Sequence, residues 1–444
     1  MESQKKYFRV TLKKPSSRLQ RFILNILSTF VLLFITFNCC IGGDVKPRKE
    51  LYTPDYNVYH NLTRIETHLT EIVDRNSNYM RLDKIYRSKE NRPQLLLRIS
   101  NFSGSRISPA PYEHLYSNVP KVRILLSYGE HAREFLPVES LFYLLKNLTD
   151  GLKMDRDSPG ERFSRMVFSN IDLFIVALVN PDGREYVERT KNYCWRGTGT
   201  GVDLNRNFDW EFAGKGSSGN KHDEEYRGPF PLSEPESRVL VDLTAKYEFD
   251  AFISLHSGIK QIYIPYADTK SQTLHRKPDN IERMIDLASL LSHSTSHHYR
   301  YGLAYELNDY TADGCVFDYM AGKRKIPFSL AIEMWGDGDL PGTQCFDLFN
   351  PRSENLVRDL KEIHPLYDTL FIYLIRWKME KMAISMDPEK EAPSLTFGLL
   401  LLGVVVLITF IFAIHKKLPP WLRMFPRRRV VSLRTLSSAF PTFS

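Results

Sequence analysis

The sequence predicts an α/β domain whose central mixed, largely parallel sheet is covered by helices on both faces. Two observations support this fold class. Strongly apolar segments, typical of strands buried on both faces of a sheet, alternate along the chain with segments of helical periodicity. No Gly/Ser-rich linker, repeat or low-complexity segment interrupts this alternation between residues 56 and 380. These residues are therefore expected to form one domain.

The individual elements follow from local patterns of apolar residues and caps. Strands are predicted where the apolar runs are short, at 94–99, 122–128, 171–179, 251–255, 261–265 and 328–334. Helices are predicted at 59–74, 137–148, 233–247, 280–297 and 351–382. The third helix begins at Ser233-Glu-Pro-Glu, which combines an N-cap residue with a proline near the first turn. In such a sheet, functional sites form at the carboxyl ends of the strands.

The net charge of +8 is concentrated at the two ends of the chain. Residues 1–21 carry seven Lys/Arg and one acidic residue, and residues 415–444 carry seven Lys/Arg and no acidic residue. The rest of the chain is therefore net negative. Because nucleic-acid binding would require basic residues on the folded domain, nucleic acid is excluded as a partner.

Long uncharged segments lie beside both basic ends. Residues 1–43 are predicted to be a signal peptide or a signal anchor, and Cys40-Ile41-Gly42 leaves cleavage open. Residues 394–414 are 21 uncharged residues, enough for a transmembrane helix because about 20 residues cross a bilayer. The basic tail at 415–444 is expected to be cytoplasmic. The sequence thus predicts a single-pass membrane protein of the secretory pathway or cell surface, with its main domain lumenal or extracellular.

The remaining segments agree with this topology. Residues 44–55 read as a lead-in to the domain at 56–380, and residues 381–393 as a juxtamembrane stalk. Glycosylation is predicted at three Asn-x-Ser/Thr sequons: Asn61, Asn101 and Asn147. Outside the signal region the cysteines are Cys194, Cys315 and Cys345, which allow at most one disulfide and leave the pairing open.

Metal-binding residue types follow two of the predicted strands. The segment after strand 122–128 contains His131-Ala-Arg-Glu134, and His256 directly follows strand 251–255. Two imidazoles and one carboxylate, with one position left for water, are the ligand set of a catalytic zinc site. Each motif alone is weak, because a surface His-x-x-Glu or a satisfied core histidine is the simpler interpretation. Their positions at strand ends give them more weight.

Further polar residues lie in otherwise apolar or glycine-rich surroundings. Asn180-Pro-Asp-Gly, Cys194-Trp-Arg-Gly and Gly201-Val-Asp-Leu-Asn-Arg-Asn follow the strand at 171–179. The guanidinium group of an arginine can hold a carboxylate by two-point contact, and Asp203 could orient a metal-bound histidine. Glu333 lies inside the apolar strand 328–334, where a carboxylate is costly unless it faces a polar cavity or a cation. A structural salt bridge is the alternative interpretation of Glu333.

In this order and spacing, the blocks resemble those of the zinc metallocarboxypeptidases of the pancreatic carboxypeptidase A and B type, peptidase family M14. The resemblance covers roughly residues 56–380 and includes the His-x-x-Glu, Asn-Pro-Asp-Gly, Gly-Val-Asp-x-Asn-Arg-Asn and Ser-Glu-Pro-Glu blocks. It implies the fold of that family and one Zn²⁺ per chain. It also implies a zinc-dependent exopeptidase that hydrolyses the C-terminal peptide bond of peptides or proteins.

The resemblance also assigns roles around the metal. It makes His131, Glu134 and His256 the zinc ligands, with Asp203 as the partner of the first histidine. Glu333 corresponds to the general base and acid that acts on a zinc-activated water. Arg196 corresponds to the arginine that stabilises the oxyanion.

Substrate-binding roles are assigned in the same way. Asn205 and Arg206 match the pair that holds the terminal carboxylate of the substrate, and Tyr310 matches the mobile tyrosine that closes over it. Phe317 lies near the position that sets side-chain preference, and predicts release of neutral or apolar residues. Two alternatives remain open: an M14-type amidase acting on a non-standard substrate, and an inactive membrane receptor with a peptidase fold.

Overall fold

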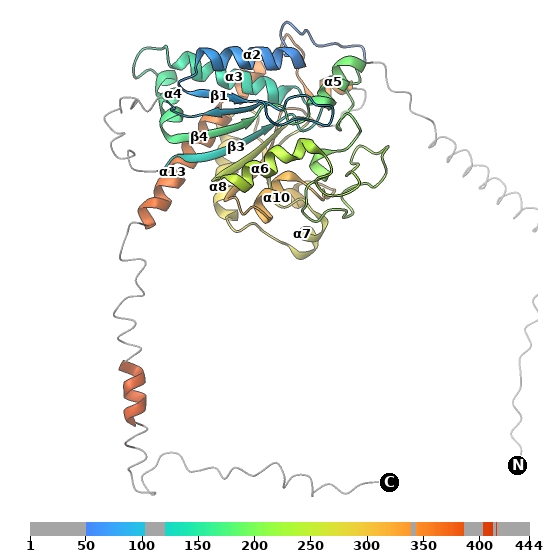
Figure 1. Cartoon of the computed structure of the whole chain (residues 1–444). Helices are drawn as coiled ribbons and strands as arrows, with labels where there is room; N and C mark the ends of the chain where they lie inside the picture. Colours follow the sequence, from blue (N-terminus) through green and yellow to red (C-terminus); the bar gives the residue numbers. More distant parts are fainter. Residues whose placement is uncertain (1–49, 103–119, 339–342, 386–402, 412–413, 415–444) are drawn as a thin grey trace, which may run out of the picture. The chain divides into compact units, whose positions relative to one another are not determined.

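One eight-stranded sheet organises the chain, of which the computed structural model describes residues 50–102, 120–338, 343–385, 403–411 and 414. The strands lie in the order β1-β2-β4-β3-β5-β8-β6-β7, and Figure 1 labels β1, β4 and β3 among them. Their bounds are β1 Met80–Asp83, β2 Leu96–Ile99, β3 Val122–Tyr128, β4 Ile171–Val176, β5 Ala251–His256, β6 Lys260–Ile264, β7 Arg300–Leu303 and β8 Phe328–Met334.

Helices separate most of these strands along the sequence. The α-helices are α2 Leu62–Arg75, α3 Leu136–Gly151, α4 Pro159–Asn170, α5 Pro181–Thr190, α6 Arg238–Lys246, α7 Thr269–Leu274, α8 Ile281–Ser294, α9 Ala304–Leu307, α10 Val316–Gly322, α11 Cys345–Phe349, α12 Leu356–Ile363 and α13 Pro365–Ser385. Short 3₁₀ helices occur at η2 Leu204–Arg206 and η3 Pro235–Ser237. Residues 403–411 are also helical.

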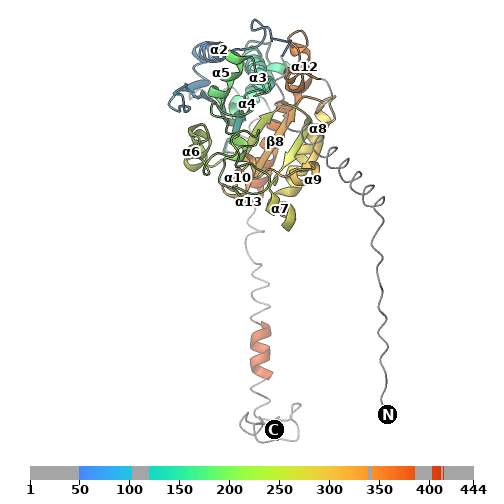
Figure 2. The same ribbon diagram turned by 90° about the vertical axis from the view of Figure 1, so that its right-hand side faces the viewer.

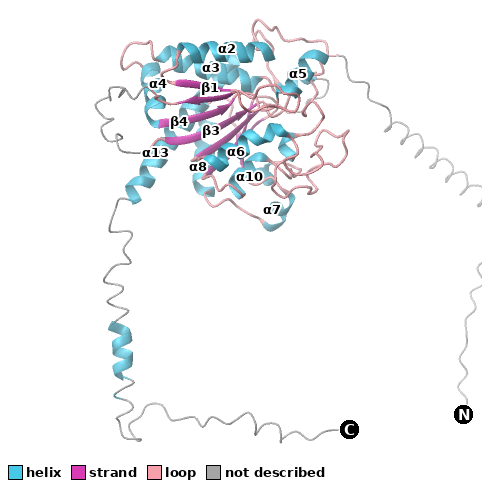
Figure 3. Ribbon diagram, viewed as in Figure 1, coloured by secondary structure: helices cyan, strands magenta, loops and turns pink. Residues whose placement is uncertain are grey.

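The strand layer lies between helices on its two faces. In Figure 1, α2 and α3 lie on one face of the sheet, and α6 and α10 lie on the other. The view turned by 90° in Figure 2 keeps these two groups of helices apart, and Figure 3 shows the strands as a separate layer between them. Every residue of β4 and β5 is buried, as expected for central strands covered on both faces. The predicted α/β class with a mixed sheet is therefore confirmed.

Pairing in the centre of the sheet brings the ends of three strands to one edge. β3 pairs with β5, and β5 pairs with β8, both in parallel. Tyr128 lies opposite Leu255, and His256 lies opposite Glu333. Antiparallel pairs flank this centre, between β1 and β2, β2 and β4, and β6 and β8. The carboxyl ends of β3, β5 and β8 therefore meet where the predicted site residues lie.

Helix α2 shows how a local pattern becomes an element. Asn61 caps its first turn, because the side-chain oxygen accepts a hydrogen bond from the backbone N–H of Arg64 at 2.8 Å. Ile65, Leu69 and Val73 recur at intervals of four residues, and all three are buried. The cap and the apolar stripe together fix both the start of the helix and the face that it buries.

The predicted bounds of β3 and β8 agree with the structure, whereas one predicted helix is wrong. The segment 351–382 was expected to be continuous, but it forms α12 and α13 with a break between His364 and Pro365. Proline lacks the backbone N–H that a helix interior needs, so the hydrogen-bond ladder is interrupted at Pro365, although His364 keeps helical backbone angles (φ −55°, ψ −36°). Pro365 consequently begins a new helix. The short edge strands β1 and β7 contain charged residues and were not predicted.

The predicted membrane segments fall largely outside the described residues. Residues 1–49 are not described, and of the predicted span at 394–414 only 403–411 and 414 are described, as helix. Within the part of the chain that the structure describes, no helix combines the length and apolar character needed to cross a membrane.

A disulfide joins Cys194 to Cys345, which are 151 residues apart in the sequence, and Cys315 is a buried free thiol. This settles the pairing that the sequence left open. Cys345 begins α11, and Cys194 precedes the segment that carries Arg196. The bridge therefore ties a loop with predicted site residues to a distant helix.

Removing this bridge should destabilise the protein. The double substitution Cys194→Ser and Cys345→Ser frees a long loop in the unfolded chain, and we expect the free energy of unfolding to fall by about 2 to 5 kcal/mol. Urea unfolding followed by tryptophan fluorescence measures the change. Cys315→Ala, which removes a buried sulfur but no bridge, is the control. Equal losses in the two variants would contradict this role of the bridge.

Candidate active site

Three potential metal ligands converge at the carboxyl ends of β3 and β5. His131 and Glu134 lie in the turn between β3 and α3, and His256 is the last residue of β5. Gly129 lets the chain turn immediately after β3, since its φ of +65° is a left-handed conformation. A Cβ at this position would also lie 2.5 Å from Leu178 Cδ1. The left-handed backbone of this turn therefore favours glycine before the ligand pair.

The donor atoms of these residues face one another. His131 Nδ1 lies 2.6 Å from Glu134 Oε1, and His256 Nδ1 lies 2.9 Å from Glu134 Oε2. The two Nδ1 atoms are 3.2 Å apart. All three side chains are buried, and burial alone would raise the pKa of Glu134, but the two histidines hold that pKa well below its usual value. Two imidazole nitrogens and an ionised carboxylate that converge in this way fit a zinc ion.

Asp203 lies behind the first histidine, at the N-cap of η2. Its Oδ1 is 3.3 Å from His131 Nε2, and its Oδ2 accepts a hydrogen bond from Arg196 Nε at 2.8 Å. The side chain is fully buried. Burial would raise the pKa of Asp203, but the charges of Arg196 and Arg206 lower it well below its usual value. Asp203 thus stays ionised and can orient the His131 ring.

Arg196 brings a fixed positive charge next to the ligands. Its Nη1 is 4.0 Å from Glu134 Oε1, while its Nε is held by Asp203. Burial would lower the pKa of Arg196, but the neighbouring carboxylates, Asp203 first, raise it. The guanidinium is charged at every accessible pH, and it can stabilise negative charge that develops near the metal centre.

Glu333 occupies β8 directly opposite His256, and it is the only residue of that strand that is not fully buried. Its Oε2 is shielded from solvent and has no hydrogen-bond partner among the described residues. Burial, followed by repulsion from Glu134, raises the pKa of Glu333 to about 7. A carboxylate with such a pKa can both accept and donate a proton near neutral pH.

Asn205 and Arg206 are adjacent in η2 and are both buried. Arg206 donates from Nε to Gly216 O and from Nη1 to Asn205 O, each at 2.9 Å, and Nη1 lies 3.7 Å from Asp203 Oδ2. Among the described residues, none of these contacts involves Nη2. Nη1 also lies 3.9 Å from Cys315 Sγ, a neighbour that the sequence did not suggest.

Tyr310 and Phe317 lie in different environments. Tyr310 is in the loop before α10 and is 61% exposed. Phe317 is 5% exposed within α10, where it belongs to a buried apolar cluster with Tyr263, Cys315 and Ala331. Tyr263 donates to Asn308 Oδ1 at 3.0 Å, and it is a further aromatic residue that the sequence did not single out. Tyr310 therefore lies at the surface, whereas Phe317 lies in the core.

One buried carboxylate near the ligands was missed by sequence reasoning. Glu130 precedes His131 and is 2% exposed. It accepts hydrogen bonds from Ser127, Ser254 and Asn205 at 2.5, 2.7 and 2.6 Å. The sequence did contain one indication of this residue, an acidic side chain close to the end of a strongly apolar strand. The His-x-x-Glu spacing drew attention to Glu134 instead.

The asparagines of the three sequons are among the described residues, and their glycosylation stays a prediction. Asn61 is the N-cap of α2. Asn147 lies in α3, where its Nδ2 is 3.1 Å from His364 Nε2. Asn101 follows β2 by two residues and is partly buried.

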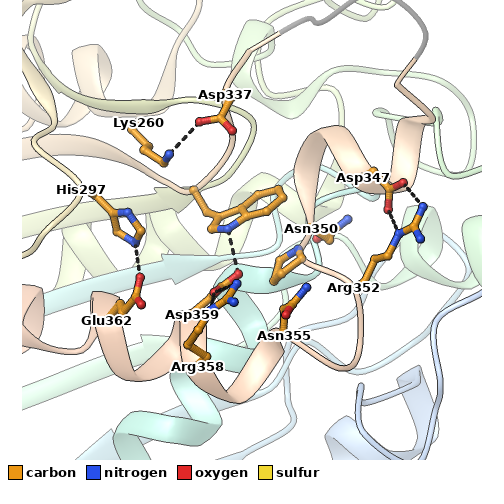
Figure 4. Close-up of a pocket in the computed structure, with 12 residues that line it drawn as sticks. Lys260, His297, Asp337, Asp347, Asn350, Arg352, Asn355, Arg358, Asp359 and Glu362 are labelled. Carbon is orange, nitrogen blue, oxygen red and sulfur yellow. Dashed lines mark hydrogen bonds and ion pairs between the residues drawn. The ribbon is translucent and has the colours of Figure 1, made fainter.

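A separate polar cavity of about 510 Å³ lies beside Trp335 (Figure 4). Its charged side chains are paired with one another: Lys260 Nζ lies 2.7 Å from Asp337 Oδ1, and Arg352 Nη2 lies 2.9 Å from Asp347 Oδ2. None of the predicted site residues lines this cavity. The converging ligands, Arg196 and Glu333 therefore remain the candidate site.

The chain matches several known carboxypeptidases in sequence. Carboxypeptidase A1 of Mus musculus is 32% identical over 279 residues, covering 59% of this chain and 64% of the relative. Carboxypeptidase O of Bos taurus is 27% identical over 374 residues, covering 77% of this chain and 92% of the relative.

Solved structures share the fold at lower sequence identity. Bovine thrombin-activatable fibrinolysis inhibitor, in complex with tick carboxypeptidase inhibitor, superposes with a TM-score of 0.58 at 22% identity, covering 72% of this chain and 99% of the other. Carboxypeptidase A from Helicoverpa armigera gives 0.57 at 21% identity, covering 74% and 77%.

The family model for zinc carboxypeptidases matches residues 65–363, which is more than half of the chain and includes all three metal ligands. The cofactor is one zinc ion, held by His131, Glu134 and His256. This chain belongs to the zinc carboxypeptidase family, peptidase M14.

Proposed function

We propose that the protein is a zinc-dependent exopeptidase that hydrolyses the C-terminal peptide bond of peptides or proteins. One observation carries the proposal: Asp203 contacts His131, Arg196 and Arg206, so a carboxylate-binding arginine lies in the same charge network as a metal ligand. An inactive receptor would be expected to have lost a metal ligand, and all three are present.

The chemistry divides between the metal and the residues around it. Zinc, when bound, lowers the pKa of a water ligand towards about 7 and polarises a carbonyl group. Glu333 accepts a proton from the attacking water and then donates it to the leaving amine when the peptide bond breaks. Arg196 stabilises the negative charge that develops on the carbonyl oxygen.

Exopeptidase selectivity would follow from recognition of the free substrate terminus. Arg206 offers its Nη2 side to the terminal carboxylate, with Asn205 beside it. A substrate without that carboxylate leaves a buried guanidinium unpaired, which costs binding energy. Tyr310 would close over the bound residue. Phe317, as a neutral and apolar residue, favours release of neutral or apolar amino acids.

The general base can be tested by substitution. Glu333→Gln keeps the shape of the side chain but cannot accept the proton, so we expect turnover of a peptide substrate to fall by about 10²- to 10⁴-fold. Zinc content, measured by mass spectrometry of the metal, should stay at one ion per chain. Glu282→Gln, at an exposed position on α8, is the control. Wild-type turnover in Glu333→Gln would show that another group is the base.

The role of Arg206 predicts strong discrimination between free and blocked termini. A peptide whose C-terminus is an amide should be cleaved about 10⁴-fold more slowly than the free acid, measured as kcat/KM from the released amino acid. Arg206→Ala should slow cleavage of the free acid and narrow this difference. Comparable cleavage of both peptides would instead favour an amidase or an endopeptidase.

We infer that the protein is anchored in a membrane of the secretory pathway, with 56–380 as the lumenal catalytic domain. The uncharged segment 394–414, the basic tail at 415–444 and the uncharged segment within 1–43 support this arrangement. The Cys194–Cys345 disulfide supports an oxidising compartment.

Protease treatment of sealed microsomal vesicles tests this topology. We expect protease to remove an epitope tag at the C-terminus and to leave the domain at 56–380 protected until detergent is added. Protection of the C-terminal tag would indicate the opposite orientation in the membrane. Release of the whole protein by alkaline carbonate would refute the anchor.

A further inference from the structure

We propose that Glu130 is a positioning residue that fixes both the second zinc-binding histidine and the amide of Asn205. Its carboxylate is 2% exposed and lies between these two side chains. Oε1 accepts from Ser127 Oγ and Ser254 Oγ, while Oε2 accepts from Asn205 Nδ2 and lies 3.3 Å from His256 Nε2. Glu134, the other carboxylate paired with His256, contacts Nδ1 instead.

The contact with His256 runs through Ser254. His256 Nδ1 faces Glu134 and His131, so a zinc ion held by these three residues would take its lone pair and the ring proton would lie on Nε2. Ser254 Oγ is 2.6 Å from Nε2 and can accept this proton. The Ser254 hydroxyl then donates its own hydrogen to Glu130 Oε1 at 2.7 Å. The chain of donors ends at Glu130, because an ionised carboxylate only accepts.

This arrangement parallels the one behind His131. Asp203 lies 3.3 Å from His131 Nε2, so each histidine has a buried carboxylate on the side away from the metal. Such partners fix the ring orientation and the tautomer of a metal-bound histidine. In both pairs a carboxylate oxygen lies 3.3 Å from Nε2, and the difference is that His256 Nε2 also has the Ser254 hydroxyl at 2.6 Å.

Glu130 therefore has two branches of contacts, one to His256 through Ser254 and a second that orients Asn205. Its Nδ2 donates to Glu130 Oε2 at 2.6 Å, and its Oδ1 accepts from the backbone N–H of Val316 at 3.1 Å. These two partners decide which end of the amide is nitrogen. The other Nδ2 hydrogen cannot be accepted by His256 Nε2, 3.2 Å away, once that nitrogen carries its proton. Among the described residues that N–H then has no acceptor, and assigning it to the substrate terminus rests on the proposed function.

Two variants separate the branches. Glu130→Gln keeps the side-chain shape, but its amide cannot accept from both serine hydroxyls and Asn205 at once. Ser254→Ala removes only the branch to His256. Zinc affinity of the metal-free full-length protein, measured by competition with a chromophoric chelator, is the first readout and is independent of catalysis. The KM and kcat of the zinc-loaded enzyme on a free-acid peptide are the second, with exposed Glu282→Gln as the control.

We expect both variants to bind zinc about 10- to 100-fold more weakly than the wild type, with Glu282→Gln unchanged. KM should rise in Glu130→Gln and stay constant in Ser254→Ala, because only the former disturbs Asn205. Restoring the acceptor with Glu130→Asp should recover part of the zinc affinity.

Other outcomes would overturn the proposal. Wild-type zinc affinity in Ser254→Ala refutes the proposed contact between Glu130 and His256 through Ser254. This measurement decides the point even if Glu130→Gln fails to fold. Weakened zinc binding with unchanged KM in Glu130→Gln refutes the branch to Asn205. A lowered melting temperature of the metal-free protein with unchanged zinc affinity would assign Glu130 a purely structural role. If the wild type binds zinc but cleaves no peptide, the proposed function fails while the zinc measurement still decides the His256 branch.

Discussion

The parallel pairing of β5 with β8 is the constraint on which the rest of the site depends. It places His256 opposite Glu333, so a metal ligand and the proposed base emerge at the same edge of the sheet. Leu255 and Ile332, the pair directly before them, are both 2% exposed and fix this register by burial. Because side chains alternate between the two faces of a strand, a shift of one residue would turn Glu333 away from His256. The hydrophobic core thus sets the geometry of the chemistry.

A single buried carboxylate then organises the charges around the metal. Asp203 contacts His131 on one side and two guanidinium groups on the other. A buried ion is costly unless it is paired, so the three contacts are mutually dependent. Arg196 and Arg206 need a carboxylate to remain buried, and Asp203 needs their charge to remain ionised. The proposed oxyanion and substrate-terminus positions are therefore held by the same group that orients a metal ligand.

The sequence predicted those parts of the site that follow from local patterns of apolar residues. β3 and β8 were located correctly because their apolar runs end sharply, and the metal ligands were found because they follow such runs. The break at Pro365 was missed because the apolar periodicity continues across it. The partner of Cys194 and the network around Glu130 could not be predicted, because both depend on contacts between residues far apart in the sequence.

Three carboxylates at the site have different roles because their neighbouring residues differ. Glu134 lies between two histidines and Asp203 lies beside Arg196, and in both cases nearby positive charge outweighs burial and lowers the pKa. Glu333 is partly buried and has no ion pair of this kind among the described residues. Desolvation and repulsion from Glu134 raise its pKa to about 7. The paired carboxylates are thereby fixed as ions that hold ligands and arginines. Among these three, only Glu333 can exchange a proton near neutral pH, which is the property that a general base requires.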